Sequence, residues 1–363
     1  MESTAADRCG AQAFRLGKDT TKPVLLICIG EYIPGAGQST VVESEILHLM
    51  HRYDITLIAP RILREIPREI RSEVISVRNP LGLWKLVRLF RSADIIHLHD
   101  SLVYMMVGVL VRNSRCIVTS HGVAPPKIRT GIWQKAKGYL TQAIYPLLYR
   151  RVRVVVGISG FVAKWSELRG VKRLNIIPNG GPPVLKEEAF RPLDKRLVYV
   201  GEVSHRKGID LLFSGLRGCP SDVSLDVIGK GNLKWALSLA RRSGISERIR
   251  FHGSLSDNER DELVGIAMAI VSMSRWEGFG LPVLEGFASG RPAIVLGGSA
   301  MEEIVRVARG GVVVDDAAGL ASAILEVWNE WDELSRNARG AVAVMGWAQT
   351  WDAYDELFRI SYE

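Results

Sequence analysis

Short runs of Val, Ile and Leu alternate with longer stretches of helical periodicity along most of the chain. The apolar runs show little polar alternation, which is typical of parallel strands covered on both faces by helices. In the first half, strands are predicted at 24–30, 54–60, 74–77, 94–100, 116–122 and 152–159. In the second half, they are predicted at 197–201, 224–229, 249–253, 269–274, 293–297 and 311–314. Two groups of six predict two doubly wound α/β domains.

The segment NGGPPVLKEEAFRPLDKR (179–196) interrupts both patterns with glycine, proline and charge, so we interpret it as the interdomain linker. We place an N-terminal domain at 22–185 and a C-terminal domain at 190–346. Residues 1–21 lack an apolar run and are predicted to form a disordered leader. A length of 363 residues suits two hydrophobic cores better than one.

Ligands of open α/β sheets bind at the carboxyl ends of the strands, so the loops that follow the strands are the candidate sites. GEYIPGAGQST (30–40) follows the first strand, and a helix is predicted to begin near Thr40. Gly35 and Gly37 permit close backbone approach, and a helix start attracts anions. The loop lacks the Gly-x-Gly-x-x-Gly pattern of dinucleotide sites. The alternative to a ligand-binding loop is a plain tight turn.

Histidines end two neighbouring strands of the first domain. In TSHGV (119–123), His121 lies where it can contact a sugar hydroxyl or move a proton, although a structural role is the alternative. In HLHD (97–100), strand alternation places His97 and His99 on one face and Asp100 at the tip. No other ligand-type residue lies nearby in the sequence, so we predict no metal site there.

Cations and carboxylates follow two strands of the second domain. Arg206 and Lys207 precede a predicted helix, an arrangement that suits a diphosphate. In SRWEGFGLPVLEG (274–286), Glu277 and Glu285 flank a glycine turn that runs into a helix. A carboxylate can bind the vicinal hydroxyls of a sugar, and the amides of Phe279–Leu281 can bind further oxygens. The alternative, in which the acids only complement a helix dipole, explains Glu285 but not Glu277.

The net charge of +8 is concentrated in one segment. Residues 127–153 contain basic and aromatic side chains but no acid. A solvated helix face is one interpretation, and attraction to anionic lipids or to a phosphorylated substrate is the other. Nucleic acid is a weaker candidate because no recognition motif accompanies the charge.

The remaining composition indicates a cytoplasmic protein. No apolar stretch is long enough to span a bilayer. The four cysteines (Cys9, Cys28, Cys116 and Cys219) lie far apart, and Cys28 and Cys116 lie within apolar runs, so we expect buried thiols and no disulfide.

At these residues the chain resembles glycosyltransferase family 4, a family of retaining, nucleotide-sugar-dependent enzymes. EGFGLPVLE (277–285) matches its Glu-x7-Glu signature, and the resemblance extends to TSHG, IPNG (177–180) and the C-terminal WAQTWDAYDELF (347–358). It implies a GT-B fold, with two Rossmann-like domains facing across a cleft and a last helix (347–363) that crosses back to the N-terminal domain.

The resemblance also implies roles for individual residues. Glu285 would bind the donor ribose, Glu277 and the amides of Phe279 and Gly280 the donor sugar, and Lys207 the diphosphate. His121 would lie near the donor sugar and the acceptor. Arg206, Leu281 and Gly37 complete the donor site that we predict.

Two positions depart from the family pattern. Glu202 stands where the family usually has Arg, and Ala36-Gly37-Gln38-Ser39 replaces Gly-Gly-x-Glu. These departures bear on how the diphosphate is stabilised. Arg206 is positioned in the sequence to replace the missing cation.

We therefore expect a retaining glycosyltransferase that moves a sugar from a nucleoside diphosphate sugar to a hydroxyl acceptor, such as a lipid-linked or cell-surface glycan precursor. We expect no cofactor and no metal, because the sequence contains no Asp-x-Asp. A location at the inner face of the membrane is a refinement of the cytoplasmic expectation. The alternatives are a catalytically silent GT-B scaffold subunit and another GT-B enzyme, such as a nucleotide-sugar epimerase or a glycan phosphorylase.

Overall fold

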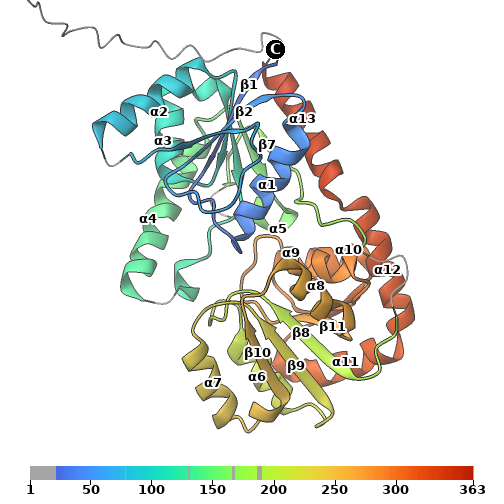
Figure 1. Ribbon diagram of the computed structural model, residues 1–363. Coiled ribbons are helices and arrows are strands. Elements are labelled where there is room, and N and C mark those ends of the chain that lie inside the picture. Colours follow the sequence, from blue (N-terminus) through green and yellow to red (C-terminus); the bar gives the residue numbers. More distant parts are fainter. Residues whose placement is uncertain (1–21, 78, 130, 166–167, 186–189, 363) are drawn as a thin grey trace, which may run out of the picture.

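The computed structural model describes residues 22–362 except 78, 130, 166–167 and 186–189, and it contains two α/β domains (Figure 1). The predicted leader (1–21) lies outside the described residues. The N-terminal sheet has the strand order β3-β2-β1-β4-β5-β6-β7, and every pair is parallel. Its strands are β1 (Val24–Ile29), β2 (Asp54–Ala59), β3 (Arg71–Val74), β4 (Ile95–His99), β5 (Cys116–Ser120), β6 (Val154–Gly157) and β7 (Leu174–Ile176).

The helices of this domain connect successive strands. They are α1 (Gly37–Leu49), α2 (Pro80–Ser92), α3 (Leu102–Arg112), α4 (Ile132–Tyr149) and α5 (Gly160–Ala163), with short 3-10 turns at η1 (Asn113–Arg115) and η2 (Pro126–Ile128). Local sequence explains the start of α2. Asn79 caps α2 by accepting a hydrogen bond from the Gly82 amide, and Pro80 occupies the first helical position, where no amide hydrogen is needed.

The C-terminal sheet has the parallel order β10-β9-β8-β11-β12-β13. Its strands are β8 (Lys195–Val200), β9 (Val223–Ile228), β10 (Ile249–Gly253), β11 (Ala269–Ser272), β12 (Ala293–Leu296) and β13 (Gly311–Val314). Its helices are α6 (Ile209–Arg217), α7 (Leu233–Arg242), α8 (Asp257–Ile266), α9 (Leu281–Ala288), α10 (Ala300–Ala308), α11 (Leu320–Asn329) and α12 (Trp331–Val344), with turns η4 (Ser246–Arg248) and η5 (Ala317–Gly319).

The last helix, α13 (Trp347–Tyr362), runs back to the N-terminal domain (Figure 1). Trp351, Tyr354 and Phe358 pack into the core beside α1 and β4. The two crossings between the domains lie against each other, because the Gly181 amide donates to the Met345 carbonyl at 2.8 Å. A side chain at Gly180 would overlap the Trp347 backbone, so glycine is required at this crossing.

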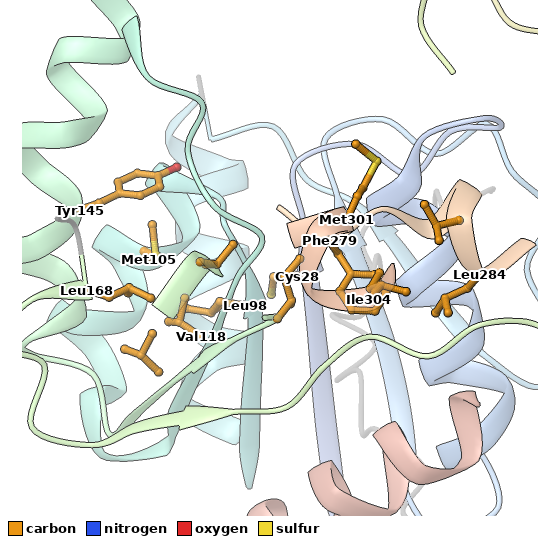
Figure 2. Packing of buried hydrophobic residues seen from close by; sticks show 14 of the residues in the cluster. Cys28, Leu98, Met105, Val118, Tyr145, Leu168, Phe279, Leu284, Met301 and Ile304 are labelled. Carbon is orange, nitrogen blue, oxygen red and sulfur yellow. The ribbon is translucent and has the colours of Figure 1, made fainter. Parts of the chain in front are cut away.

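The apolar packing continues from one domain into the other. One buried cluster joins Cys28, Leu98 and Val118 of the first sheet to Phe279, Met301 and Ile304 of the second domain (Figure 2). Cys28, Cys116 and Cys219 are buried free thiols, as expected, and Cys9 lies outside the described residues. In the described part of the chain, none of the helices has the length and hydrophobicity needed to span a bilayer.

The doubly wound α/β prediction is confirmed, but several details of the sequence prediction are wrong. The first sheet has seven strands, because the short edge strand β7 carries too weak an apolar signal to be recognised. Strand β3 covers Arg71–Val74 rather than 74–77, since Ile75 packs into the core after the strand ends. Helix α1 begins at Gly37, not near Thr40, and β8 begins at Lys195, inside the predicted linker.

Candidate active site

The strand order of the C-terminal sheet reverses between β8 and β11, and the loops after these strands form the centre of the candidate site. Ligands of doubly wound sheets bind at such a reversal. Gly208, with φ +70, brings the β8–α6 loop against β11: a side chain there would overlap the Met273 carbonyl. This close approach places the predicted cation Lys207 beside the predicted carboxylate Glu277.

Lys207 forms an ion pair with Glu277 between these two loops. Both side chains are largely buried, with exposed fractions of 15% and 19%. Each is therefore held by the other with limited access to water. The pair presents a cation and a carboxylate at one point, and such a pair can bind a phosphate oxygen and a sugar hydroxyl side by side.

Glu202, the departure from the family pattern, pairs with the other predicted cation. Its carboxylate accepts a hydrogen bond from the Arg206 guanidinium at 2.9 Å, across one turn of the β8–α6 loop. Arg206 is thereby oriented by an acid from its own loop.

Arg275 clamps the same two loops and was not recognised in the sequence. Its guanidinium binds both carboxylate oxygens of Asp210, at 2.7 and 2.6 Å, and donates to the His205 carbonyl at 2.6 Å. Its amide donates to the Arg206 carbonyl at 3.0 Å. Burial raises the pKa of Asp210, but Arg275 outweighs this and lowers it. The clamp fixes the backbone on both sides of Lys207.

Helix α9 begins directly after this loop. Gly280 precedes it with φ 113, where a side chain would overlap Met301, and Pro282 lies in its first turn. Among the described residues, the amides of Phe279, Gly280 and Leu281 have no hydrogen-bond acceptor. The helix start therefore offers free donors and the positive end of the helix dipole to an anion or a sugar oxygen.

Glu285 lies one turn further along α9, with 18% of its side chain exposed. Burial raises its pKa, and the Arg260 guanidinium, 4.0 Å away, offsets only part of this effect. The carboxylate has no hydrogen-bond donor among the described residues. A buried acceptor without a donor favours a ligand that supplies hydroxyl hydrogens.

The N-terminal domain meets this loop at β5 and β6. A side chain at Gly278 would overlap the His121 carbonyl, and one at Gly122 would contact the Trp276 ring. The Ser159 hydroxyl donates to the Gly278 carbonyl at 2.7 Å. His121 therefore lies against the loop that carries Glu277. Gly37 also faces this region, since a side chain there would lie at ordinary contact distance from Leu281.

Arg129 of the N-terminal domain also interacts electrostatically with Arg206 of this site. The Arg129 guanidinium donates to the Ala124 carbonyl at 2.9 Å. Burial lowers its pKa, and the positive charge of Arg206 adds to the effect. Sequence reasoning counted Arg129 only as part of the basic segment, because its relation to Arg206 depends on how the domains meet.

A buried polar cluster lies behind His121, and the sequence had indicated its histidines but not its carboxylate. Glu45 of α1 contacts His97 Nδ1 at 2.6 Å and His99 Nε2 at 2.9 Å. His99 Nδ1 lies 2.9 Å from His121 Nε2. Within the described chain, Glu45, His97 and His99 are the residues whose spacing could hold a metal ion. Both oxygens of Glu45 are already used by the imidazoles, so the observed geometry is that of a hydrogen-bonded cluster.

A signal for Glu45 existed in the sequence. It occupies the apolar stripe of α1 together with Val41, Val42, Ile46 and Leu49. A carboxylate within such a stripe predicts a buried polar partner.

Two facing parallel sheets with loops meeting at their strand ends define the GT-B class of fold. Solved GT-B proteins are similar over nearly the whole chain. They include sucrose-phosphate synthase from Thermosynechococcus elongatus (TM-score 0.77, 19% identity, 93% of this chain and 98% of that one) and WaaG, a glycosyltransferase of lipopolysaccharide biosynthesis (TM-score 0.73, 14%, 92% and 99%). A third is Anabaena Alr3699/HepE in complex with UDP-glucose (TM-score 0.73, 16%, 92% and 99%).

The chain belongs to glycosyltransferase family 4. Residues 35–182 match the model "Glycosyltransferase Family 4", and residues 185–341 match "Glycosyl transferases group 1". Glycogen synthase of Mycobacterium tuberculosis is 32% identical over 264 residues, which cover 68% of this chain and 63% of the glycogen synthase. The lipopolysaccharide core mannosyltransferase LpsB of Rhizobium meliloti is 27% identical over 288 residues, covering 74% and 75%.

Proposed function

We propose that this protein is a retaining glycosyltransferase that uses a nucleoside diphosphate sugar. The observation that carries the proposal is the meeting of Lys207 and Glu277 at the sheet reversal, beside the free amides at the start of α9. Glu285 lies one turn further along α9 and binds the ribose diol. Membership of the family supports the same assignment.

In the proposed reaction, the bond between the anomeric carbon and the phosphate oxygen breaks as the acceptor oxygen attacks that carbon from the same face. The bonding electrons leave with the nucleoside diphosphate. The acceptor hydroxyl loses its proton to the departing phosphate oxygen, so atoms and charge balance. Lys207 and the α9 amides stabilise the negative charge that grows on the phosphate.

We propose that Arg206 supplies the second cation in place of the arginine that the family usually carries at position 202. Its pairing with Glu202 orients the guanidinium, and the negative carboxylate partly offsets its positive charge. With these cations the leaving group needs no divalent metal. Activity that persists in a chelator would support this, and a strict requirement for manganese or magnesium would contradict it.

A hexose is the proposed sugar. The supporting observations are the names of the relatives, a glycogen synthase and a mannosyltransferase, and the UDP-glucose bound by Anabaena Alr3699/HepE. A thermal-shift panel of nucleotide hexoses would identify the donor. The cognate compound should raise the melting temperature in proportion to the logarithm of its concentration.

Acceptor-dependent release of nucleoside diphosphate then tests the transfer itself. A transferase releases it rapidly only with acceptor present, and NMR of the product should show the anomeric configuration of the donor. Conversion of the donor to an isomer without an acceptor would indicate an epimerase. Donor binding with neither slow hydrolysis nor transfer would indicate a scaffold subunit.

The acceptor is proposed to be lipid-linked, because α4 presents an apolar and basic face to solvent. Trp133 is 86% exposed, and Ile132, Tyr139, Leu140 and Leu147 are also exposed along the helix. Lys135 and Lys137 lie among them, and no acid occurs between 127 and 153. Exposed apolar side chains beside unopposed cations fit an anionic lipid surface. Figure 1 shows α4 at the edge of the N-terminal domain that points toward the C-terminal domain.

Sedimentation with vesicles containing phosphatidylglycerol tests this surface. Binding should weaken as salt rises, and the double variant Trp133→Gln/Lys137→Gln should bind about tenfold less tightly. The matched control is Val307→Gln/Arg306→Gln, which removes one exposed apolar side chain and one cation from α10. No binding of the wild-type protein at low salt would favour a soluble acceptor.

A further inference from the structure

The buried cluster behind His121 contains a carboxylate that the proposed transfer chemistry does not use. Glu45, His97 and His99 are fully buried. Glu45 has no Lys or Arg partner among the described residues, and its two oxygens face one imidazole each. A buried carboxylate is tolerated only when donors surround it, so this arrangement constrains where the imidazole protons lie.

Glu45 is ionised. Burial raises its pKa, but the interactions with His97 and His99 outweigh that effect and lower the pKa to about 2. Because a carboxylate only accepts hydrogen bonds, His99 must carry a proton on Nε2, which lies 2.9 Å from Glu45 Oε2. If Nε2 were unprotonated, two lone pairs would face each other in a fully buried site.

The proton on His99 Nε2 determines the next contact. Burial, with a smaller contribution from His97, lowers the pKa of His99, so this imidazole is neutral and its Nδ1 has a lone pair. Nδ1 lies 2.9 Å from His121 Nε2, which must then be the donor. Burial also lowers the pKa of His121, so its own Nδ1 is unprotonated.

The remaining nitrogen is the one available to a substrate. His121 Nδ1 has no hydrogen-bond partner among the described residues, yet it is not one of the fully buried unpaired atoms. The His121 backbone lies against Gly278 in the loop that carries Glu277. The His121 backbone is therefore next to the proposed donor-sugar site.

We propose that Glu45 is a positioning residue that acts through His99 to hold His121 in the Nε2-protonated tautomer, so that His121 Nδ1 accepts a hydrogen bond from a hydroxyl of the bound sugar. The assignment of that hydroxyl rests on the proposed function. The tautomer itself does not, because it follows from contacts within the N-terminal domain. Tyr354 and Thr119, which hydrogen-bond to each other at 2.6 Å, close the far side of the cluster at His97.

The nitrogen chemical shifts of the His121 ring in labelled full-length protein, without substrate, test the tautomer directly. Wild-type protein should show Nε2 protonated and Nδ1 unprotonated near neutral pH. His99→Phe removes the acceptor of the Nε2 proton, so the two His121 tautomers should mix and the shifts should average. His99→Gln keeps an oxygen acceptor in reach and should restore the wild-type pattern in part.

The matched control is His97→Phe. It makes the same substitution at the imidazole that contacts the other oxygen of Glu45, and His97 has no hydrogen bond to His121. It should leave the His121 shifts unchanged. Activity provides the second measurement: kcat/KM should fall about two- to tenfold further in His99→Phe than in His97→Phe, the effect of one hydrogen bond.

A wild-type spectrum with Nδ1 protonated, or with both nitrogens protonated, would overturn the proposal. A stoichiometric metal ion bound to Glu45 in the purified protein would do the same. If His99→Phe fails to fold, the wild-type spectrum alone decides. Because that spectrum needs no substrate, a failed tautomer assignment is distinguishable from a failed transferase assignment.

Discussion

Glu285 is the side chain whose role can be tested with the simplest substitution. Glu285→Ala should weaken binding of the nucleotide sugar by about 1–3 kcal/mol, because the ribose diol loses a charged acceptor. The melting temperature should change little, since the carboxylate makes no hydrogen bond in the described structure. Isothermal titration with the cognate donor measures the difference.

A neighbouring acid provides the control for Glu285. Asp257→Ala removes a carboxylate that pairs with Arg260 at 2.8 Å but lies outside α9. It should leave donor affinity within about twofold of wild type, as expected for an exposed ion pair. If both variants bind the donor as tightly as the wild-type protein, Glu285 does not hold the ribose.

At the residue scale, the sequence predicted which loops and helices carry the candidate residues, because each of them follows a strand or lies near the start of a helix. It could not indicate which residues pair. The contact of Lys207 with Glu277 and the bond of Glu202 to Arg206 depend on loop conformation. His97 and His99 were correctly placed on one face, but their partner Glu45 belongs to a helix far away in the sequence.

At the element scale, the Arg275 clamp should be required for both stability and donor binding. Arg275→Met leaves the Asp210 carboxylate without its bidentate partner and frees the β8–α6 loop. We expect a loss of about 1–3 kcal/mol in the free energy of unfolding, measured in urea. Donor affinity should also fall, because Lys207 loses its fixed backbone.

Arg306→Met is the matched control, since it breaks an exposed Arg–Glu pair of 2.7 Å on α10. Its cost should stay below about 0.5 kcal/mol. Equal effects of the two substitutions would mean that the clamp contributes no more than a surface ion pair.

The order of the elements was predictable because apolar strands and amphipathic helices have different periods. The residues at which the strands and helices begin and end were less predictable. The C-terminal residues of several predicted strands, among them Gly122 and Ser274, lie in loops of the site, where turn geometry outweighs strand propensity. The edge strand β3 is polar, which suits a strand with only one neighbouring strand. The prediction therefore placed the strand on the apolar residues that follow, at 74–77.

For the whole molecule, the buried histidines predict that stability declines as pH falls. Burial lowers the pKa of His99 and of His121 in the folded state, whereas both return to about 6.5 when the chain unfolds. Below about pH 6.5 the unfolded state therefore binds more protons, and the free energy of unfolding decreases. Glu45, with its pKa lowered to about 2, adds a further loss below about pH 4.5.

Urea unfolding at pH 7.5, 6.5 and 5.5 measures this dependence. His121→Gln should unfold with a shallower pH dependence, smaller by up to about 1.4 kcal/mol per pH unit, the effect of one proton. Identical slopes for the variant and the wild-type protein would show that His121 titrates alike in the folded and unfolded states.

The alternating pattern and the Glu-x7-Glu motif were sufficient to predict a two-domain GT-B protein of this family. How the domains meet was not predictable. The contacts of Gly122 with Trp276 and of Ser159 with Gly278 join residues far apart in sequence, and no local pattern encodes them.

The central claim, that cations at the sheet reversal stabilise a departing nucleoside diphosphate, is tested most directly by its acceptor-dependent release from the cognate donor in a chelator. The account predicts turnover by the wild-type protein and losses of about 100-fold or more in Lys207→Ala, with a comparable loss in Arg206→Ala. The contradicting result is full activity of Arg206→Ala together with greatly increased activity of Glu202→Arg. That outcome would mean that Arg206 does not replace the cation missing at position 202.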